Sequence, residues 1–159
     1  MSRLRLVVVL GAIALVAAGV VVGRVIAQSD TSTVVRTPLA QSTKVKGAAG
    51  RTLGLARVTV PAGDTIALHH HEGTQIAHIQ KGVLTYTVKA GSVQVMSGPA
   101  DEAKAVRKIS AGQTGKIRAG QWIVEQPSTI HQAANNGSGP IVIYLATLLK
   151  DGAPPSTPN

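Results

Sequence analysis

The sequence contains no cysteine and no phenylalanine, and its only aromatic residues are Tyr86, Trp122 and Tyr144. Without cysteine the chain can form neither disulfides nor thiolate metal sites, so histidine, carboxylate or amide groups would have to hold any metal ion. The apolar residues are mainly Val, Ala, Leu and Ile. A core rich in β-branched residues and poor in large aromatics favours a pleated sheet over a helical bundle.

Acidic residues are also few, since 16 basic residues stand against 7 acidic ones, for a formal net charge of +9. Part of this excess belongs to the N-terminus, where Arg3, Arg5 and Arg24 precede every acidic residue. The remaining basic residues are scattered and have no aromatic residues interleaved with them, unlike the clusters typical of nucleic-acid binding. The sequence therefore predicts a solvated basic surface and no nucleic-acid partner.

The first 27 residues have the features of a targeting segment. Arg3 and Arg5 precede an uncharged run of 17 residues from Leu6 to Val22, which is at the low end of what spans a bilayer. Small or modest residues before Ala27 favour a signal peptide at residues 1–27 that is cleaved after Ala27. The alternative is an uncleaved N-terminal membrane anchor. Both interpretations predict a secreted or extracytoplasmic membrane-anchored domain that contacts the membrane only through this segment.

The rest of the chain divides into a linker, one domain and a tail. Residues 28–49 are rich in Ser, Thr, Gln and Ala without a strong period, which indicates a linker with room for one short edge strand. Residues 150–159 carry three prolines and are predicted to be a disordered tail. Between them, short alternating stretches such as "LGLARVTV" and "VLTYTVKAG" are separated by turn residues. This pattern predicts an all-β sandwich or barrel over residues 50–149, in which only "ADEAKAVRK" also allows a helix.

The stretch "HHHEGTQ" at residues 69–75 is the strongest functional signal. Successive side chains of a strand point to opposite faces, so His69 and His71 share one face and His70 lies on the other. Gln75 begins the next strand, and His131 comes from a distant one. Together they offer a divalent metal three imidazoles and an amide oxygen.

These residues resemble the two motifs of the cupin superfamily. The first motif matches at every spacing as Gly63-x5-His69-x-His71-x3-Gln75-x6-Gly82, and the second as Gly120, Pro127, His131 and Asn135. The resemblance implies a double-stranded β-helix (cupin or jelly-roll) barrel over residues 50–149. It also implies a divalent transition metal (Fe, Zn, Cu, Ni or Mn) held by His69, His71, Gln75 and His131. The chain departs from the family pattern at Gln75, where the family has Glu, and at Pro127, which precedes His131 by four residues instead of five.

An amide at position 75 changes the expected charge of the site. Gln75 leaves a divalent ion with its full charge, which predicts weaker binding of hard cations and easier binding of an anionic ligand. Glu72 is the substitute carboxylate nearest in sequence, but it lies in the turn and on the wrong face. His78 is expected to face away from the pocket, and Asn135 to satisfy backbone groups. Tyr86 and Trp122 could line the pocket or fill the core, and core filling is the more common fate of such side chains.

The cupin superfamily includes dioxygenases, isomerases, decarboxylases, lyases and non-catalytic binding proteins, and the fold does not choose among them. One hypothesis is an exported metal-dependent enzyme that acts on a small oxygenated substrate. The alternative is a non-catalytic module that binds a small molecule or a metal. A metal-free barrel whose histidines bind an organic ligand directly also stays open. The resemblance further suggests a possible homodimer paired through the sheets.

Overall fold

The computed structural model describes residues 33–159, which form an all-β unit without any helix, and hence without a helix that could span a membrane. The signal peptide or anchor predicted at residues 1–27 lies outside the described residues. The strands are β1 (Val35–Ser42), β2 (Arg51–Val60), β3 (Thr65–His70), β4 (Gly73–Lys81), β5 (Val83–Ala90), β6 (Ser92–Ser97), β7 (Lys104–Ser110), β8 (Thr114–Arg118), β9 (Gln121–Glu125), β10 (Ile130–Ala134), β11 (Ile141–Lys150) and β12 (Thr157–Pro158).

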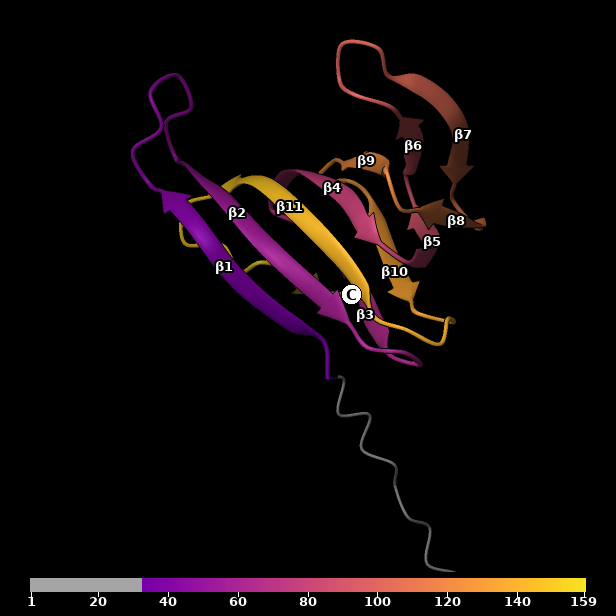
Figure 1. Ribbon diagram of the computed structural model, residues 1–159. Helices are drawn as coiled ribbons and strands as arrows, with labels where there is room; N and C mark the ends of the chain where they lie inside the picture. Colours follow the sequence, from indigo (N-terminus) through magenta and orange to yellow (C-terminus); the bar gives the residue numbers. More distant parts are fainter. Residues whose placement is uncertain (1–32) are drawn as a thin grey trace, which may run out of the picture. The chain divides into compact units, whose positions relative to one another are not determined.

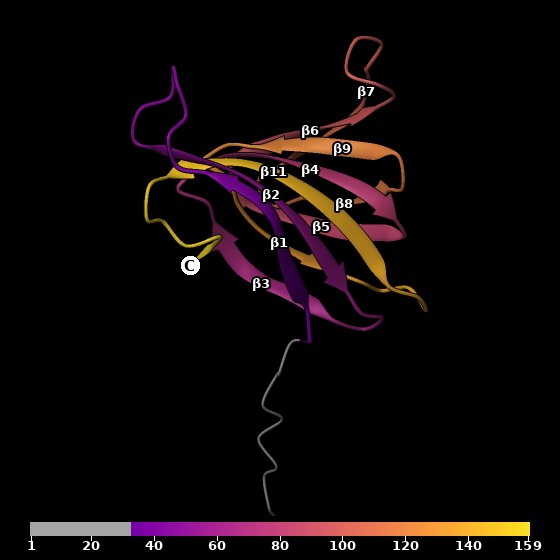
Figure 2. The ribbon, with the colours of Figure 1, turned by 60° about the vertical axis from the view of Figure 1, so that its left-hand side comes forward.

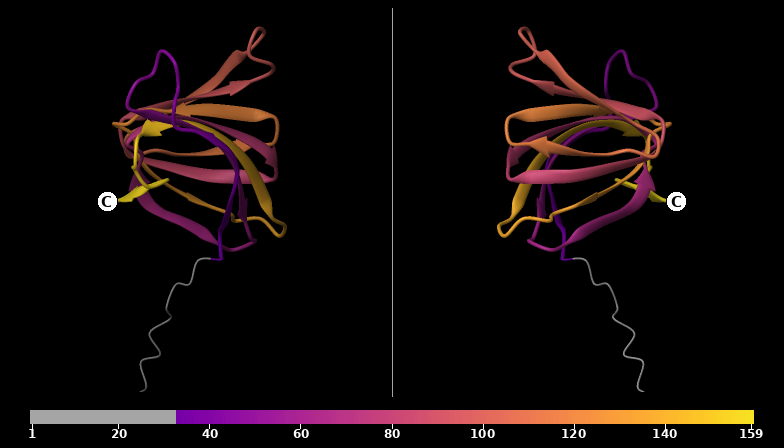
Figure 3. Two further views of the ribbon diagram at one scale, coloured as in Figure 1. Left: turned by 90° about the vertical axis from the view of Figure 1, so that its left-hand side faces the viewer. Right: turned by 90° about the vertical axis from the view of Figure 1, so that its right-hand side faces the viewer.

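The strands form two antiparallel sheets that face each other (Figure 1). The seven-stranded sheet has the order β1-β2-β11-β4-β9-β6-β7, and the five-stranded sheet has the order β12-β3-β10-β5-β8. Figure 3 shows the two curved layers and the β6–β7 hairpin that extends beyond them. The prediction of an all-β barrel is confirmed, and "ADEAKAVRK" contains no helix, because its residues from Lys104 onward belong to strand β7.

The core lies between the sheets and consists almost entirely of Val, Ile, Leu and Ala. Alternate residues of each strand point inward, as the burial of β2 shows, where Val58 and Val60 are buried and Arg57 is exposed. Burying each such Val or Ile side chain contributes about 1.5–3 kcal/mol. Tyr86 is the only aromatic residue among the buried hydrophobic side chains of residues 33–159. The core therefore contains few large side chains, which leaves space for a cavity within it.

Both segments that flank the predicted domain take part in the sheets. Residues 35–42 of the expected linker form edge strand β1, which pairs with β2 from Val35 opposite Thr59 to Ser42 opposite Leu53. The expected disordered tail instead forms β12, which pairs with the edge of β3 (Figure 2). An unpaired strand edge offers free backbone groups. The Asn159 amide uses one of them by donating to the Leu68 carbonyl, so the prediction of disorder was wrong.

Two glycines of the cupin-like motif have a conformational role. Gly63 and Gly82 have φ angles of 82° and 86°, in the left-handed region that glycine adopts without a steric penalty. Gly63 lies in the turn before β3, and Gly82 lies in the turn between β4 and β5. A Cβ at Gly82 would also lie 2.9 Å from Cγ1 of Ile141. These turns therefore set the start of β3 and the end of β4, the strands adjoining the histidine stretch.

Candidate metal centre

Strand pairing brings the three predicted histidines together inside the barrel. His69 on β3 lies directly opposite His131 on β10, and His71 follows the end of β3. The pairing of β10 shifts register at His131 with respect to both of its neighbours, a local irregularity of the kind that redirects a side chain. The three residues are 8%, 2% and 3% exposed for His69, His71 and His131. One ligand atom from each lies within 4.8 Å of the others.

A backbone carbonyl fixes the orientation of each imidazole ring. The Nδ1 atoms of His69, His71 and His131 lie 2.6, 2.8 and 3.3 Å from the carbonyl oxygens of Ala67, Pro155 and Thr129, respectively. A carbonyl only accepts, so each Nδ1 carries the hydrogen and each Nε2 of the neutral ring keeps a lone pair that can bind a further partner. This outer arrangement is typical of histidines that bind a metal.

Burial lowers the pKa of all three histidines, and their proximity to one another lowers it further. The nearby Glu125 and the backbone carbonyls oppose this effect without reversing it. The neutral imidazole, which is the form that binds a metal, is therefore favoured at neutral pH. The cluster can hold a metal ion.

A buried carboxylate that the sequence interpretation did not count among the metal ligands lies beside the cluster. Glu125 on β9 is 3% exposed and lies directly opposite Gln75 on β4. Its Oε1 accepts a hydrogen bond of 2.7 Å from the Tyr86 hydroxyl, and its Oε2 accepts one from the Gln75 amide nitrogen. The same amide nitrogen lies 2.9 Å from Nε2 of His71. The amide of Gln75 thus presents its nitrogen, and not its oxygen, to the cluster.

The position of Glu125 points to a cation in this place. Its carboxylate oxygens lie 3.1 Å from Nε2 of His131 and 3.6 Å from Nε2 of His71. Carboxylate oxygens and imidazole lone pairs repel each other unless a proton or a metal ion lies between them. The three imidazoles, with the Glu125 carboxylate beside them, therefore fit a divalent transition metal.

The charge of Glu125 corrects the expectation that Gln75 leaves the site without a compensating anion. Burial raises the pKa of the Glu125 carboxyl, but His131, His71 and the hydrogen bonds from Gln75 and Tyr86 lower it by more. The net pKa is below its ordinary value, so Glu125 is charged at neutral pH. The carboxylate of this site is at position 125 on β9, directly opposite position 75 on β4, and not at position 75 itself. The prediction that the site binds hard cations weakly therefore loses its physical basis, because it assumed that no anion lies beside the ion.

The fold is similar to solved structures of cupin domains. No family model and no curated protein matches the sequence. A cupin 2 domain-containing protein from Halorhodospira halophila is 12% identical and superimposes with a TM-score of 0.51, over 79% of this chain and 70% of that chain. The Cnp3 cupin domain of Schizosaccharomyces pombe is 13% identical with a TM-score of 0.50, over 74% of this chain and 65% of that chain. The chain has the cupin fold. At these identities the likeness establishes the fold and leaves the activity open.

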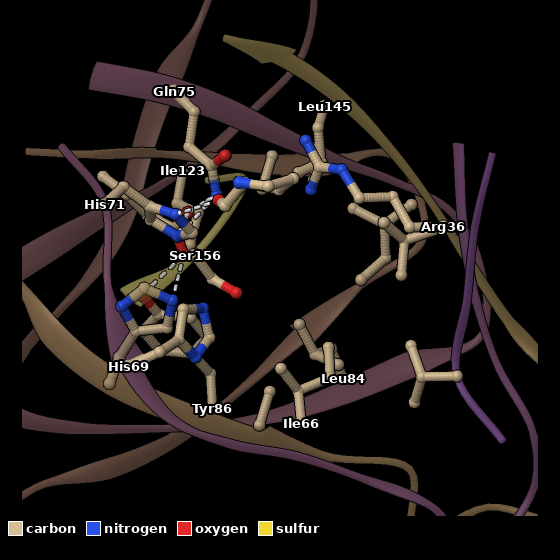
Figure 4. Close-up of a pocket in the computed structure, with 18 residues that line it drawn as sticks. Arg36, Ile66, His69, His71, Gln75, Leu84, Tyr86, Ile123, Leu145 and Ser156 are labelled. Atoms are coloured by element: carbon tan, nitrogen blue, oxygen red, sulfur yellow. Dashed lines mark hydrogen bonds and ion pairs between the residues drawn. The ribbon is translucent and has the colours of Figure 1, made fainter. Parts of the chain in front are cut away.

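The cupin barrel encloses a cavity of about 180 Å³ beside the histidine cluster. Figure 4 shows the cluster, with Gln75 and Tyr86, at one side and Arg36 and Leu145 at another. Most of the wall is aliphatic, from Val34, Val58, Ile66, Ala77, Leu84, Ile123, Ala133, Ile143 and Leu145. Pro155 and Ser156 of the C-terminal segment also line it. The space suits several waters or one small organic molecule.

The remaining candidate residues lie mostly where the alternation of the strands predicts. His70 faces out of the cupin barrel, where it contacts Glu72 at 3.4 Å and Asn159 at 2.8 Å. Glu72 is exposed and does not reach the cluster. His78 lies on the outer surface beside Trp122 and lines a shallow hollow there.

Asn135 satisfies backbone groups, as predicted. Its amide nitrogen donates to the carbonyls of Val60, Pro61 and Gly139, and its amide oxygen accepts from the Gly137 amide. These bonds connect the end of β10 to the end of β2 and to the turn before β11.

Tyr86 both fills the core and lines the pocket, the two outcomes allowed for it, whereas Trp122 does neither. Tyr86 is buried, but it also stacks on His131 with ring centroids 4.9 Å apart and holds Glu125 in place. Trp122 points outward, and its indole nitrogen donates to the Gly98 carbonyl. The parity of β9 explains this difference, because Ile123 and Glu125 take the inward positions and Trp122 the outward one.

The C-terminal segment is expected to support the metal centre of the cupin barrel. A chain that ends at Gly152 lacks the Pro155 carbonyl that orients His71. Loss of such an outer partner typically costs about 10- to 100-fold in metal affinity, and we expect a decrease of that size in a competition titration with a chromogenic chelator. A chain that ends at Pro158 loses only the contacts of Asn159 and should bind metal as the full chain does. Equal affinity of the Gly152-terminated chain would contradict the role of the segment.

Proposed function

We propose that this protein is a metal-binding cupin in which His69, His71 and His131 hold a divalent transition metal that acts on a small oxygenated molecule. The observation that carries the proposal is the convergence of three buried imidazoles whose Nδ1 atoms all face backbone carbonyls. That arrangement leaves an Nε2 lone pair on each ring available to a metal ion. The Nε2 of His71 faces the Gln75 amide nitrogen at 2.9 Å, and a bound ion would take the place of that contact.

Gln75 and Glu125 have complementary roles in this proposal. Glu125 supplies the negative charge beside the ion, and Gln75 holds that carboxylate through its amide nitrogen. Gln75 could bind the ion through its oxygen, as the cupin pattern implies, only after its amide turned over. The turned amide would direct an oxygen at the Glu125 carboxylate, which is repulsive. We therefore assign Gln75 to the support of Glu125.

The bound ion would supply Lewis acidity, or a centre for oxygen, to a molecule in the cavity. The side chains of the protein contribute a dry and shaped surrounding. The aliphatic wall lowers the local dielectric constant, which strengthens electrostatic interactions within the cavity. Tyr86 keeps Glu125 oriented, and because burial and the nearby charge of Glu125 raise its pKa, Tyr86 stays a neutral donor.

A non-catalytic role is the second candidate, and one specific observation favours it. Both oxygens of Glu125 accept hydrogen bonds, from Tyr86 and from Gln75. Each oxygen thus has one lone pair engaged, and these hydrogen bonds stabilise the charged carboxylate and make it a weaker base. Among residues 33–159 no other carboxylate lines the cavity. Chemistry that needs a protein base is thus disfavoured, whereas capture of a small molecule or a metal is not.

Metal analysis of the full chain, followed by turnover assays, separates the two candidates. We expect about one equivalent of metal per chain. Iron, copper or nickel together with oxygen consumption on a diketone, phenol or thiol substrate would support the enzyme. Zinc without turnover would support the binding module. Absence of any metal, after incubation with each ion and removal of the excess, would refute the proposed centre.

We also propose that the domain works outside the cytoplasm. The basic start and the apolar run from Leu6 to Val22 support this proposal. Fractionation of cells that produce the full chain tests it, because a cytoplasmic location of the mature protein would contradict it. The N-terminal residue of the exported form would distinguish cleavage after Ala27 from an uncleaved anchor.

A further inference from the structure

Arg36 is a cationic group in the wall of an otherwise mostly aliphatic cavity. It comes from β1, the edge strand, where Val34 and Arg36 line the cavity and Val35 between them is exposed. Figure 4 shows its side chain extending from β1 toward the side of the cavity where Gln75 lies. The same residue also borders a second, more polar hollow that includes Pro38. The guanidinium therefore lies where a molecule inside the barrel can reach it.

The guanidinium has no hydrogen bond or ion pair within the described part of the chain. Glu125 attracts it through space, but the oxygens of Glu125 already accept from Gln75 and Tyr86. Half-burying an arginine without a partner costs free energy, because it removes part of the hydration of the charge. A charge kept at such a place is suited to an anion that enters the cavity.

A second unpartnered group lines the cavity on the side of the histidine cluster. The Oε1 atom of Gln75 is buried and accepts no hydrogen bond, and Gln75 as a whole is only 4% exposed. An amide oxygen can only accept, so it is suited to a hydroxyl or N–H group of a ligand. The cavity thus offers one cationic donor and one neutral acceptor, in addition to the histidine cluster.

We propose that the cavity binds a small aliphatic monocarboxylate, with its carboxylate paired to Arg36 and a hydroxyl donor near Gln75. The inference rests on the proposed function, since it names the class of molecule that lies beside the metal centre. A guanidinium matches the planar geometry of a carboxylate and binds it through two parallel hydrogen bonds. The branched aliphatic wall favours a short apolar body over a polar one.

The charge balance favours a monoanion over a phosphate. Among residues 33–159, Arg36 is the only Lys or Arg residue that lines this cavity, and the charged Glu125 lines it as well. A phosphate dianion would need more donors than one guanidinium supplies, and the carboxylate of Glu125 would repel its second charge. A single carboxylate has one charge for Arg36 to neutralise.

Binding of 2-hydroxyisovalerate to the full chain tests the inference, with its neutral amide, 2-hydroxyisovaleramide, as the control ligand. Calorimetry is performed on metal-loaded protein and on protein stripped with a chelator, so that the contribution of Arg36 is separated from that of the ion. Arg36→Met removes the charge and keeps most of the apolar stem, and Arg36→Lys keeps the charge without the planar fork. Arg57→Met on the exposed face of β2 is the matched control.

In both forms of the protein, Arg36→Met should weaken binding of the acid by roughly 10- to 100-fold and leave binding of the amide unchanged. Arg36→Lys should fall between the parent and Arg36→Met, and Arg57→Met should match the parent. Isovalerate, which lacks the hydroxyl, should bind about 3- to 10-fold more weakly than 2-hydroxyisovalerate.

The inference is overturned if the acid binds Arg36→Met and Arg36→Lys as tightly as the parent, or if the parent binds acid and amide alike. It is also overturned if the parent binds neither ligand at a ligand concentration of about 50 millimolar. A dissociation constant above that concentration corresponds to a binding free energy of less than about 2 kcal/mol. Metal content is measured on the same samples. Loss of metal binding with Arg36-dependent acid binding intact would refute the proposed function alone, and full metal content without acid binding would refute this inference alone.

Discussion

The variant His131→Ala will retain less than about a tenth of the metal that the full chain binds under the same conditions. His131 provides one of three converging imidazoles, and its loss leaves only the two from the β3 end of the site. Removing an outer partner of a ligand already costs about 10- to 100-fold in affinity, and removing the ligand itself should cost more. Metal content after gel filtration, measured by atomic emission, checks this expectation.

His78→Ala is the matched control for this variant, because His78 is also on a sheet but faces the outer surface. It should keep the full metal content. A second measurement guards against a folding defect. Metal at 100 times its dissociation constant should stabilise the full chain and His78→Ala by about 2.7 kcal/mol and leave the thermal midpoint of His131→Ala unchanged. Retention of stoichiometric metal by His131→Ala would remove the histidine cluster as the binding site.

The histidine pair at residues 69 and 71 and its partner at 131 could be predicted from the sequence because their geometry is local and periodic. Strand alternation places His69 and His71 on one face, and the spacing of the glycines marks the ends of their strands. The same parity correctly excluded His70 and His78. These assignments need only the alternation of strand side chains between the two faces of a sheet, which can be read directly from the sequence.

Glu125 and the C-terminal segment could not be placed in the same way, because their roles depend on pairing between distant strands. The parity of "QWIVE" puts Glu125 on the same face as Ile123, and that signal was available. Its position opposite Gln75 depends on the register of β4 with β9, and this register is fixed by the whole sheet. The prolines at the C-terminus suggested disorder, yet it is the Pro155 carbonyl, which no sequence pattern singles out, that orients His71.

The second largest effect on metal affinity is expected from changes at Glu125 on β9 and at the opposed Gln75 on β4. Glu125→Gln removes the only carboxylate among residues 33–159 that lines the cavity beside the cluster. Two unit charges 4 Å apart interact by about 4 kcal/mol at an effective dielectric constant near 20, so this variant should bind a divalent ion about 100-fold more weakly or worse. The double variant Gln75→Glu with Glu125→Gln restores one carboxylate and one amide on the same two opposed positions. It should recover at least about tenfold of the lost affinity, measured by competition with a chelator.

Gln75→Glu alone completes the cycle and separates charge from packing. Without metal, two carboxylates at opposed buried positions repel each other, so this variant should unfold at a lower urea concentration than the parent. With metal it should bind at least as tightly as the parent, because a divalent ion neutralises both charges. The coupling between the two positions should be about 1–3 kcal/mol, as for residues in direct contact. Additive effects of the two single changes would mean that Glu125 acts independently of Gln75, and the carboxylate at position 125 would then not replace the one that cupins have at position 75.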